Sequence, residues 1–152
     1  MTLRDQMTHE LKAAMRAKDA ERLATLRLIN AAIKDREIAA RSDAKVQELD
    51  DADLIAVLTR MVKQRRDSAR AYEEAARLDL AEKELAEIAV IESFLPRQLS
   101  QDEMEAAIDA VIARLGATSV RDIGKVMGAL KAEYAGQMDF GKAGALIKTR
   151  LA

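Results

Sequence analysis

The chain has 152 residues, of which 34% are charged and only 3% aromatic, and its formal net charge is −1. The absence of cysteine excludes thiol catalysis, disulfides and Cys-ligated zinc. No apolar run approaches the roughly 18 residues of a membrane span, and the charged N-terminus lacks the apolar core of a signal peptide, so we expect a cytoplasmic protein.

Helical periodicity extends along nearly the whole chain, and no segment shows sustained alternation with a period of two. A first helix is predicted from apolar residues at intervals of four, and these inward positions are Leu3, Met7, Leu11 and Met15. Asp19 is expected to cap a second helix, whose inward positions are Leu23, Leu26, Ile29 and Ile33. The charged stretch over residues 40–50 is expected to form an exposed loop.

A long third helix is predicted to start at Asp50 or Asp51. Its inward stripe comprises Leu54, Ile55, Leu58, Met61, Val62, Arg65, Ala69 and Tyr72. Asp79 and Glu82 have capping-box spacing, so a fourth helix is expected there, with three inward positions at Leu85, Ile88 and Ile91. The acidic run 48–53 could hold Mg²⁺, but acids also suit a helix start, and we favour the capping interpretation.

Pro96, the only proline, ends the fourth helical pattern because it lacks a backbone donor and disfavours helical geometry at Leu95. We therefore place a domain boundary here. Ser100 and Glu103 have the spacing of a capping box for a fifth helix. Its inward positions are Met104, Ile108, Val111, Ile112 and Leu115.

Gly116 is expected to end the fifth helix in the left-handed conformation. Ser119 is expected to start a sixth helix that ends at Gly136, and Asp139 to start a seventh. The sequence therefore predicts an all-α protein. It has an N-terminal bundle of about four helices over residues 1–95 and a small three-helix domain over residues 96–152.

The sixth helix carries the most specific signal. Its core stripe comprises Ile123, Val126, Met127, Leu130 and Tyr134. Gly124 and Gly128 lie mid-helix on the opposite arc, although each costs about 1 kcal/mol relative to Ala. The same arc carries three cations, Arg121, Lys125 and Lys131. Two interpretations stay open: the glycines admit a polyanion whose phosphates the cations neutralise, or they permit close helix packing.

Cations outside the sixth helix provide further candidate contacts. Residues 119–152 carry six Lys and Arg against three Asp and Glu. In the seventh helix these are Lys142, Lys148 and Arg150, of which the last two also suit the dipole of a last turn. A possible secondary basic face in the third helix comprises Lys63, Arg66, Arg70 and Arg77. Acids within salt-bridge reach also fit a solvated, internally paired surface, and they are Asp67, Glu73 and Glu74.

Three segments, residues 63–75, 91–100 and 116–131, resemble the bacterial YqeY (GatB/YqeY) family in the same order, and the resemblance covers essentially the whole chain. That family is similar to the helical tail of the B subunit of tRNA-dependent amidotransferases. The resemblance implies a helical bundle followed by a three-helix domain. It also implies tRNA contact through Gly124–Met127 and the segment that follows. In those enzymes, amide formation takes place outside the tail.

These observations favour a non-catalytic protein that binds tRNA or another structured RNA. The expected contacts are Arg121, Gly124, Lys125, Gly128, Lys131, Lys142 and Lys148. Without interleaved aromatic residues, contact is expected to the RNA backbone rather than to stacked bases. The only histidine, His9, is expected on the exposed side of the first helix, and the sequence has no phosphate-binding motif. No cofactor, metal, membrane or DNA partner is expected.

Two alternatives remain. The chain could be a carbon–nitrogen ligase with glutamine as amido-N-donor, active only together with other amidotransferase subunits. It could instead be a protein-interaction module that binds another translation-related protein through an apolar groove.

Overall fold

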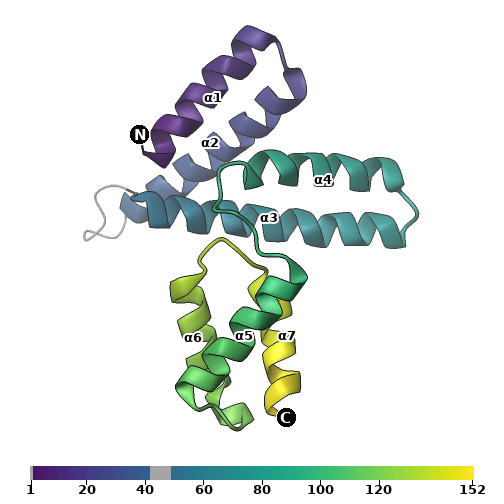
Figure 1. Cartoon of the computed structure of the whole chain (residues 1–152). Coiled ribbons are helices and arrows are strands. Elements are labelled where there is room, and N and C mark those ends of the chain that lie inside the picture. Colours follow the sequence, from purple (N-terminus) through teal and green to yellow (C-terminus); the bar gives the residue numbers. More distant parts are fainter. Residues whose placement is uncertain (1, 42–48) are drawn as a thin grey trace. The chain divides into compact units, whose positions relative to one another are not determined.

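A computed structural model of the protein describes residues 2–41 and 49–152, which form seven α-helices and one 3₁₀ turn and contain no strand (Figure 1). This confirms the predicted all-α class. Within these ranges no helix has both the length and the apolar character needed to cross a membrane. Backbone contacts divide the chain into two compact units, residues 1–95 and residues 96–152. Each unit has its own hydrophobic core.

The N-terminal unit contains four helices, which are α1 (Leu3–Ala17), α2 (Ala20–Arg41), α3 (Asp51–Glu74) and α4 (Leu78–Glu92). α3 and α4 form a long antiparallel pair, and α2 packs against α1, α3 and α4 (Figure 1). The largest fully buried side chains at their meeting point are those of Ile29, Leu54, Leu58 and Ile91. This core follows the apolar stripes that the sequence predicts for the second to fourth helices.

Two predicted helix starts in this unit are confirmed. The Asp19 carboxylate accepts a hydrogen bond from the Arg22 backbone N–H at 3.2 Å. Asp50 and Asp53 form a reciprocal capping box at the start of α3, with distances of 2.9 and 3.1 Å. Two members of the acidic run thus serve as caps, as the capping interpretation holds. Of the loop predicted over residues 40–50, the first two belong to α2, and 42–48 lie outside the described residues.

The predicted capping box at Asp79 and Glu82 is wrong. α4 begins at Leu78, one residue before Asp79, and its N-cap residue Arg77 makes no side-chain capping bond. The cause is a tight turn at Ala76, whose φ of 58° is left-handed and brings the chain into the helix early. The Asp79 carboxylate accepts hydrogen bonds from the Arg77 guanidinium instead, at 3.3 Å.

Three side chains predicted to face inward are exposed. Met15 is 54% exposed, Leu85 49% and Leu115 43%. Met15 and Leu115 lie in the last turns of their helices. Leu85 lies to one side of the buried row that contains Ala81 and Ile88. The apolar repeat in the sequence therefore predicts the buried face of these helices correctly. It also includes residues that neighbouring helices do not cover.

The C-terminal unit contains α5 (Gln101–Leu115), the 3₁₀ turn η1 (Val120–Asp122), α6 (Ile123–Glu133) and α7 (Phe140–Leu151). Its three helices pack against one another in every pairing. Four core side chains have no exposed surface: Ile108, Val126, Leu130 and Ile147. The sixth helix predicted from Ser119 is real, but its first turn is the tighter η1.

Other expected caps of this unit are also present. Ser100 and Glu103 form the predicted capping box at the start of α5. The Arg97 guanidinium donates two hydrogen bonds of 2.9 Å to Glu103, and together with the Ser100 N–H it lowers the pKa of that carboxyl to about 2. Gly116 ends α5 with a φ of 64°, and Asp139 caps α7 by accepting the Gly141 N–H at 2.9 Å.

Two leucines of the C-terminal unit provide a matched test of its core. Leu130→Ala should lower the free energy of unfolding by about 2–5 kcal/mol, because it leaves a cavity at a fully buried position. Leu115→Ala makes the same chemical change at an exposed position and should cost less than about 1 kcal/mol. Urea denaturation followed by circular dichroism measures both, and equal losses would contradict the proposed burial.

Candidate nucleic-acid interface

The start of the η1–α6 segment is fixed by two side chains. The Ser119 hydroxyl accepts the Arg121 N–H at 3.3 Å, and the Asp122 carboxylate accepts the N–H groups of Thr118 (3.0 Å) and Ser119 (3.4 Å). The Thr118 and Ser119 N–H groups lower the pKa of Asp122, and the charge of Lys125 lowers it further. The Asp122 carboxylate is thus held by backbone hydrogen bonds, and these bonds fix the orientation in which α6 begins.

The rotation of α6 is set by its buried side. Val126 and Leu130 have no exposed surface, and Ile123 and Met127 pack against the same core. The side chains and glycines on the opposite side are all exposed, and they are Arg121, Gly124, Lys125, Gly128 and Lys131. We call this set the α6 face. The structure therefore brings together the five residues that the sequence assigns to one arc.

The two glycines of the α6 face are not covered by the described chain. A Cβ atom built at Gly124 or at Gly128 would have no neighbouring atom within 4 Å. Packing against another helix of the same unit, the other interpretation of these glycines, is therefore not seen among the described residues. Around the helix both glycines lie between Lys125 and Lys131, so a strip of bare backbone is bordered by a cation on each side.

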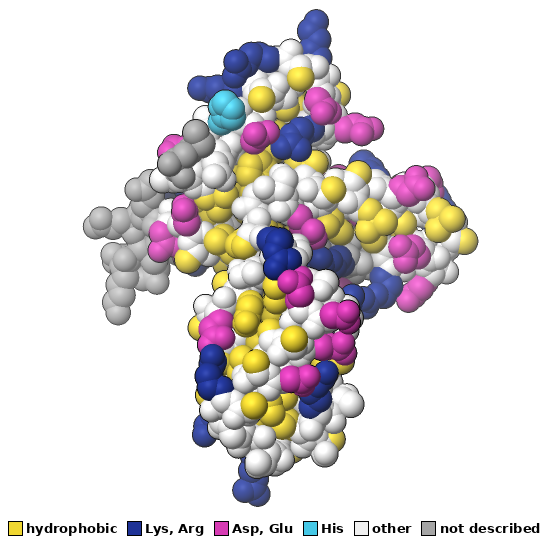
Figure 2. All heavy atoms as spheres, viewed as in Figure 1, with side chains coloured by type: hydrophobic (Ala, Val, Ile, Leu, Met, Phe, Trp, Pro, Cys, Tyr) yellow, Lys and Arg dark blue, Asp and Glu magenta, His cyan; other side chains and the backbone are white. Residues whose placement is uncertain are grey.

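The cations of the α6 face are not neutralised by neighbouring acids. Arg121, Lys125 and Lys131 form no ion pair with any described residue. The nearby Glu133 is paired with Arg114 of α5 instead. In Figure 2, Lys and Arg side chains project from the edge of the C-terminal unit where α6 lies. The face is therefore positive and open to solvent.

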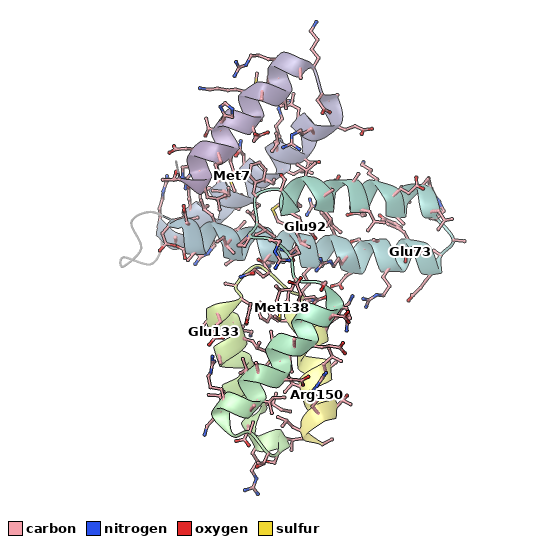
Figure 3. All side chains as sticks on the ribbon, in the orientation of Figure 1. Met7, Glu73, Glu92, Glu133, Met138 and Arg150 are labelled. Atoms are coloured by element: carbon pink, nitrogen blue, oxygen red, sulfur yellow. The ribbon has the colours of Figure 1, made fainter. Side chains whose placement is uncertain are left out.

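One of the three cations of α7 is paired and two are not. Arg150 turns toward α5 (Figure 3), where it pairs with Asp109 at 2.5 Å and Glu105 at 3.8 Å. Lys142 and Lys148 are exposed and form no ion pair with the described residues. Gly144 marks the α6 side of α7, because a Cβ there would lie 3.9 Å from the Met127 sulfur.

Helical spacing then separates the two free lysines of α7. At about 100° per residue, Lys148 falls about 40° from Gly144, whereas Lys142 falls about 160° away. Lys148 therefore lies on the side of α7 next to α6, and Lys142 lies on the side away from α6. Of the α7 residues predicted to contact RNA, the geometry associates Lys148 with the α6 face and leaves Lys142 apart from it.

The possible secondary basic face in the N-terminal unit is largely neutralised. Lys63 pairs with Asp67 at 3.2 Å, Arg66 pairs with Glu92 at 2.9 Å, and Arg77 pairs with Asp79 at 3.3 Å. Of the four cations, Arg70 alone forms no ion pair with the described residues. The interpretation as a solvated, internally paired surface is therefore the one that the contacts favour.

Comparisons with known proteins locate this chain among its relatives. The family described as Yqey-like protein matches residues 4–151. The protein called altered inheritance of mitochondria protein 41, mitochondrial, of Kluyveromyces lactis is 35% identical over 112 residues, covering 72% of this chain and 58% of that protein. Its namesake in Lachancea thermotolerans is 36% identical, covering 70% and 54%, and that in Eremothecium gossypii is 33% identical, covering 75% and 63%.

The relatives correct two expectations. They are named as mitochondrial proteins, which contradicts the cytoplasmic location predicted from the sequence. They come from yeasts, so the comparisons do not support the restriction to bacteria that the resemblance carried. The chain spans between half and two thirds of the length of these relatives.

The exposed glycines predict an unusual stability effect. Gly128→Ala should raise the free energy of unfolding of the C-terminal unit by about 0.5–1 kcal/mol, because alanine loses less chain entropy and meets no neighbour. Gly116→Ala, the same change at a φ of 64°, should lower it by about 1–2 kcal/mol. Thermal unfolding measures the stability of both variants. A destabilised Gly128→Ala variant would show that another part of the protein contacts this side of the helix.

The pH dependence of the C-terminal unit should include a contribution from Asp122. Its pKa lies below the ordinary 3.8, so its contribution to stability is complete above that pH and is lost as the pH falls through the lowered value. An NMR titration of the carboxyl carbon should give a pKa below 3.8. Asp122→Asn should remove this contribution to the loss of stability at low pH. A measured pKa of Asp122 at or above 3.8 would contradict the backbone contacts.

Proposed function

Because this chain belongs to the Yqey-like protein family, as the match over residues 4–151 shows, we propose that it is a non-catalytic RNA-binding protein that holds tRNA or another structured RNA on its α6 face. The names of its relatives refer to the inheritance of mitochondria and do not mention RNA. The support for the proposal therefore comes from the geometry and from the resemblance of the sequence to an amidotransferase tail.

The observation that carries the proposal is the exposure of Gly124 and Gly128. Mid-helix glycine costs about 1 kcal/mol relative to alanine, and neither packing nor a positive φ within the described chain accounts for it here. Glycine at these positions does allow another molecule to approach the helix backbone closely. A ligand that comes this near and lies between two lysines is expected to carry negative charge.

The composition of the face favours an RNA backbone over its bases. Lysine and arginine neutralise phosphates without reading the sequence. Base stacking requires exposed aromatic rings, and the two aromatic residues nearest to α6, Tyr134 and Phe140, are half-buried against the core of the unit. A folded RNA that presents a continuous row of phosphates, such as tRNA, therefore suits this face better than an unstructured single strand.

Two lysines of the face provide the direct test. Lys125→Gln/Lys131→Gln should weaken the binding of total tRNA, because each lysine is expected to neutralise a phosphate. The slope of log affinity against log salt concentration should become shallower by about one unit per lysine removed. Fluorescence anisotropy over a range of NaCl concentrations measures both quantities.

The matched control removes two exposed, unpaired lysines from the N-terminal unit, as Lys12→Gln/Lys34→Gln, and should leave the affinity nearly unchanged. Gly128→Gln adds no charge but covers the bare strip, so it should also weaken binding while the unit stays folded. An unmodified chain that shows no salt-sensitive binding, or a control that loses as much affinity as the test variant, would refute the proposal.

A further inference from the structure

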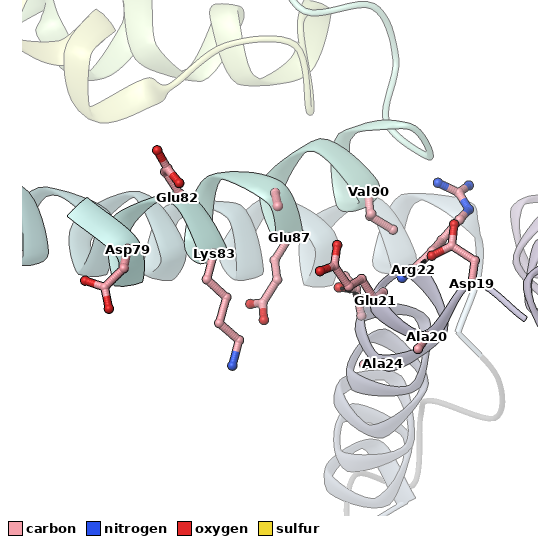
Figure 4. A pocket seen from close by; sticks show the side chains of 12 residues that line it. Asp19, Ala20, Glu21, Arg22, Ala24, Asp79, Glu82, Lys83, Glu87 and Val90 are labelled. Atoms are coloured by element: carbon pink, nitrogen blue, oxygen red, sulfur yellow. Dashed lines mark hydrogen bonds between the residues drawn. The ribbon is translucent and has the colours of Figure 1, made fainter. Parts of the chain in front are cut away.

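A groove in the N-terminal unit is formed where the first turns of α2 meet the side of α4 (Figure 4). Its volume is about 770 Å³. Its lining includes small apolar residues supplied by both helices, and they are Ala20, Ala24, Ala86 and Val90. Because three of these four are alanines, the backbones of α2 and α4 are accessible to another helix at short range.

Acidic side chains dominate the rim of this groove. The lining contains five carboxylates, of Asp19, Glu21, Asp79, Glu82 and Glu87, and two cations, Arg22 and Lys83. Two of the carboxylates are already paired, Glu87 with Arg65 at 2.9 Å and Asp79 with Arg77 at 3.3 Å. Arg22 is already paired with Glu10 at 3.1 Å, whereas the carboxylates of Glu21 and Glu82 form no bond to any described residue. In Figure 4, Glu21 projects from α2 toward α4, and Glu82 projects from α4.

We propose that this groove binds the α6 face of a second copy of the chain. The two surfaces are opposite in charge, since Glu21 and Glu82 are free on one and Lys125 and Lys131 are free on the other. They also match in side-chain size, because alanines line the groove and two glycines lie on the α6 face.

The contact joins two different surfaces, so copies can associate either as a reciprocal pair, in which each face enters the other copy's groove, or head to tail. In both arrangements the average mass should rise with protein concentration. Because the complementary charges are exposed, salt should weaken the association. The inference does not rest on RNA binding, but a polyanion bound to the α6 face would compete with the groove.

Sedimentation velocity on the nuclease-treated, nucleic-acid-free full chain tests the inference. At about 50 mM NaCl the weight-average sedimentation coefficient should increase with concentration, and at about 300 mM NaCl the increase should diminish. Glu21→Lys/Glu82→Lys should shift the association to concentrations at least about tenfold higher, and Lys125→Glu/Lys131→Glu should do the same. An equimolar mixture of the two variants should associate again, because one retains the natural face and the other the natural groove.

Asp35→Lys/Asp102→Lys is the matched control. It makes the same change in net charge at two exposed carboxylates that do not line the groove, and it should associate as the unmodified chain does. Circular dichroism verifies that every variant remains folded. Concentration-independent sedimentation of the unmodified chain, an equal loss in the control, or a mixture that fails to associate would overturn the inference. The tRNA affinity of Glu21→Lys/Glu82→Lys separates failure of this inference from failure of the proposed function. An unchanged affinity would leave the proposed function standing even if the copies do not associate.

Discussion

The packing of α6 against the core of the C-terminal unit determines what the helix presents to its surroundings. Val126 and Leu130 are completely buried, and their positions fix the rotation of the helix about its axis. Once that rotation is set, the 3.6-residue period places Gly124 and Gly128 outward together with the lysines beside them. The candidate interface is therefore the exposed side of a helix whose other side packs in the core. A change in core packing that rotates α6 would reorient the interface.

Ion pairing distinguishes the two basic surfaces of the chain more clearly than charge content does. The third helix carries more cations than the sixth, yet Arg66 pairs with Glu92 and Lys63 with Asp67. In the C-terminal unit, Asp122 bonds to backbone N–H groups and Glu133 to Arg114, so neither acid forms an ion pair with a cation of the α6 face. A polyanion gains most where it meets cations that have no other partner, which favours α6.

Much of the fold could be predicted because helix caps and apolar periods are local features of the sequence. Asp50, Ser100 and Asp139 cap the helices that their positions predict. The errors arise where the tertiary context decides. The turn at Ala76 moved the start of α4, and the exposure of Leu85 depends on how far neighbouring helices extend. The α6 face was predictable as an arc, but whether a neighbour covered its glycines was not.

The groove between α2 and α4 shows the limit of such reasoning. Residues 19–25 and 79–90 are far apart in the sequence, and neither stretch has a pattern that marks a binding surface. The helix-capping role of Asp19 is readable locally, whereas its place on an acidic rim arises only when α2 packs against α4. Charge complementarity between this rim and the α6 face is thus a property of the folded chain. Sequence counts indicate it only as a modest excess of acid in residues 1–95 and of base in residues 119–152.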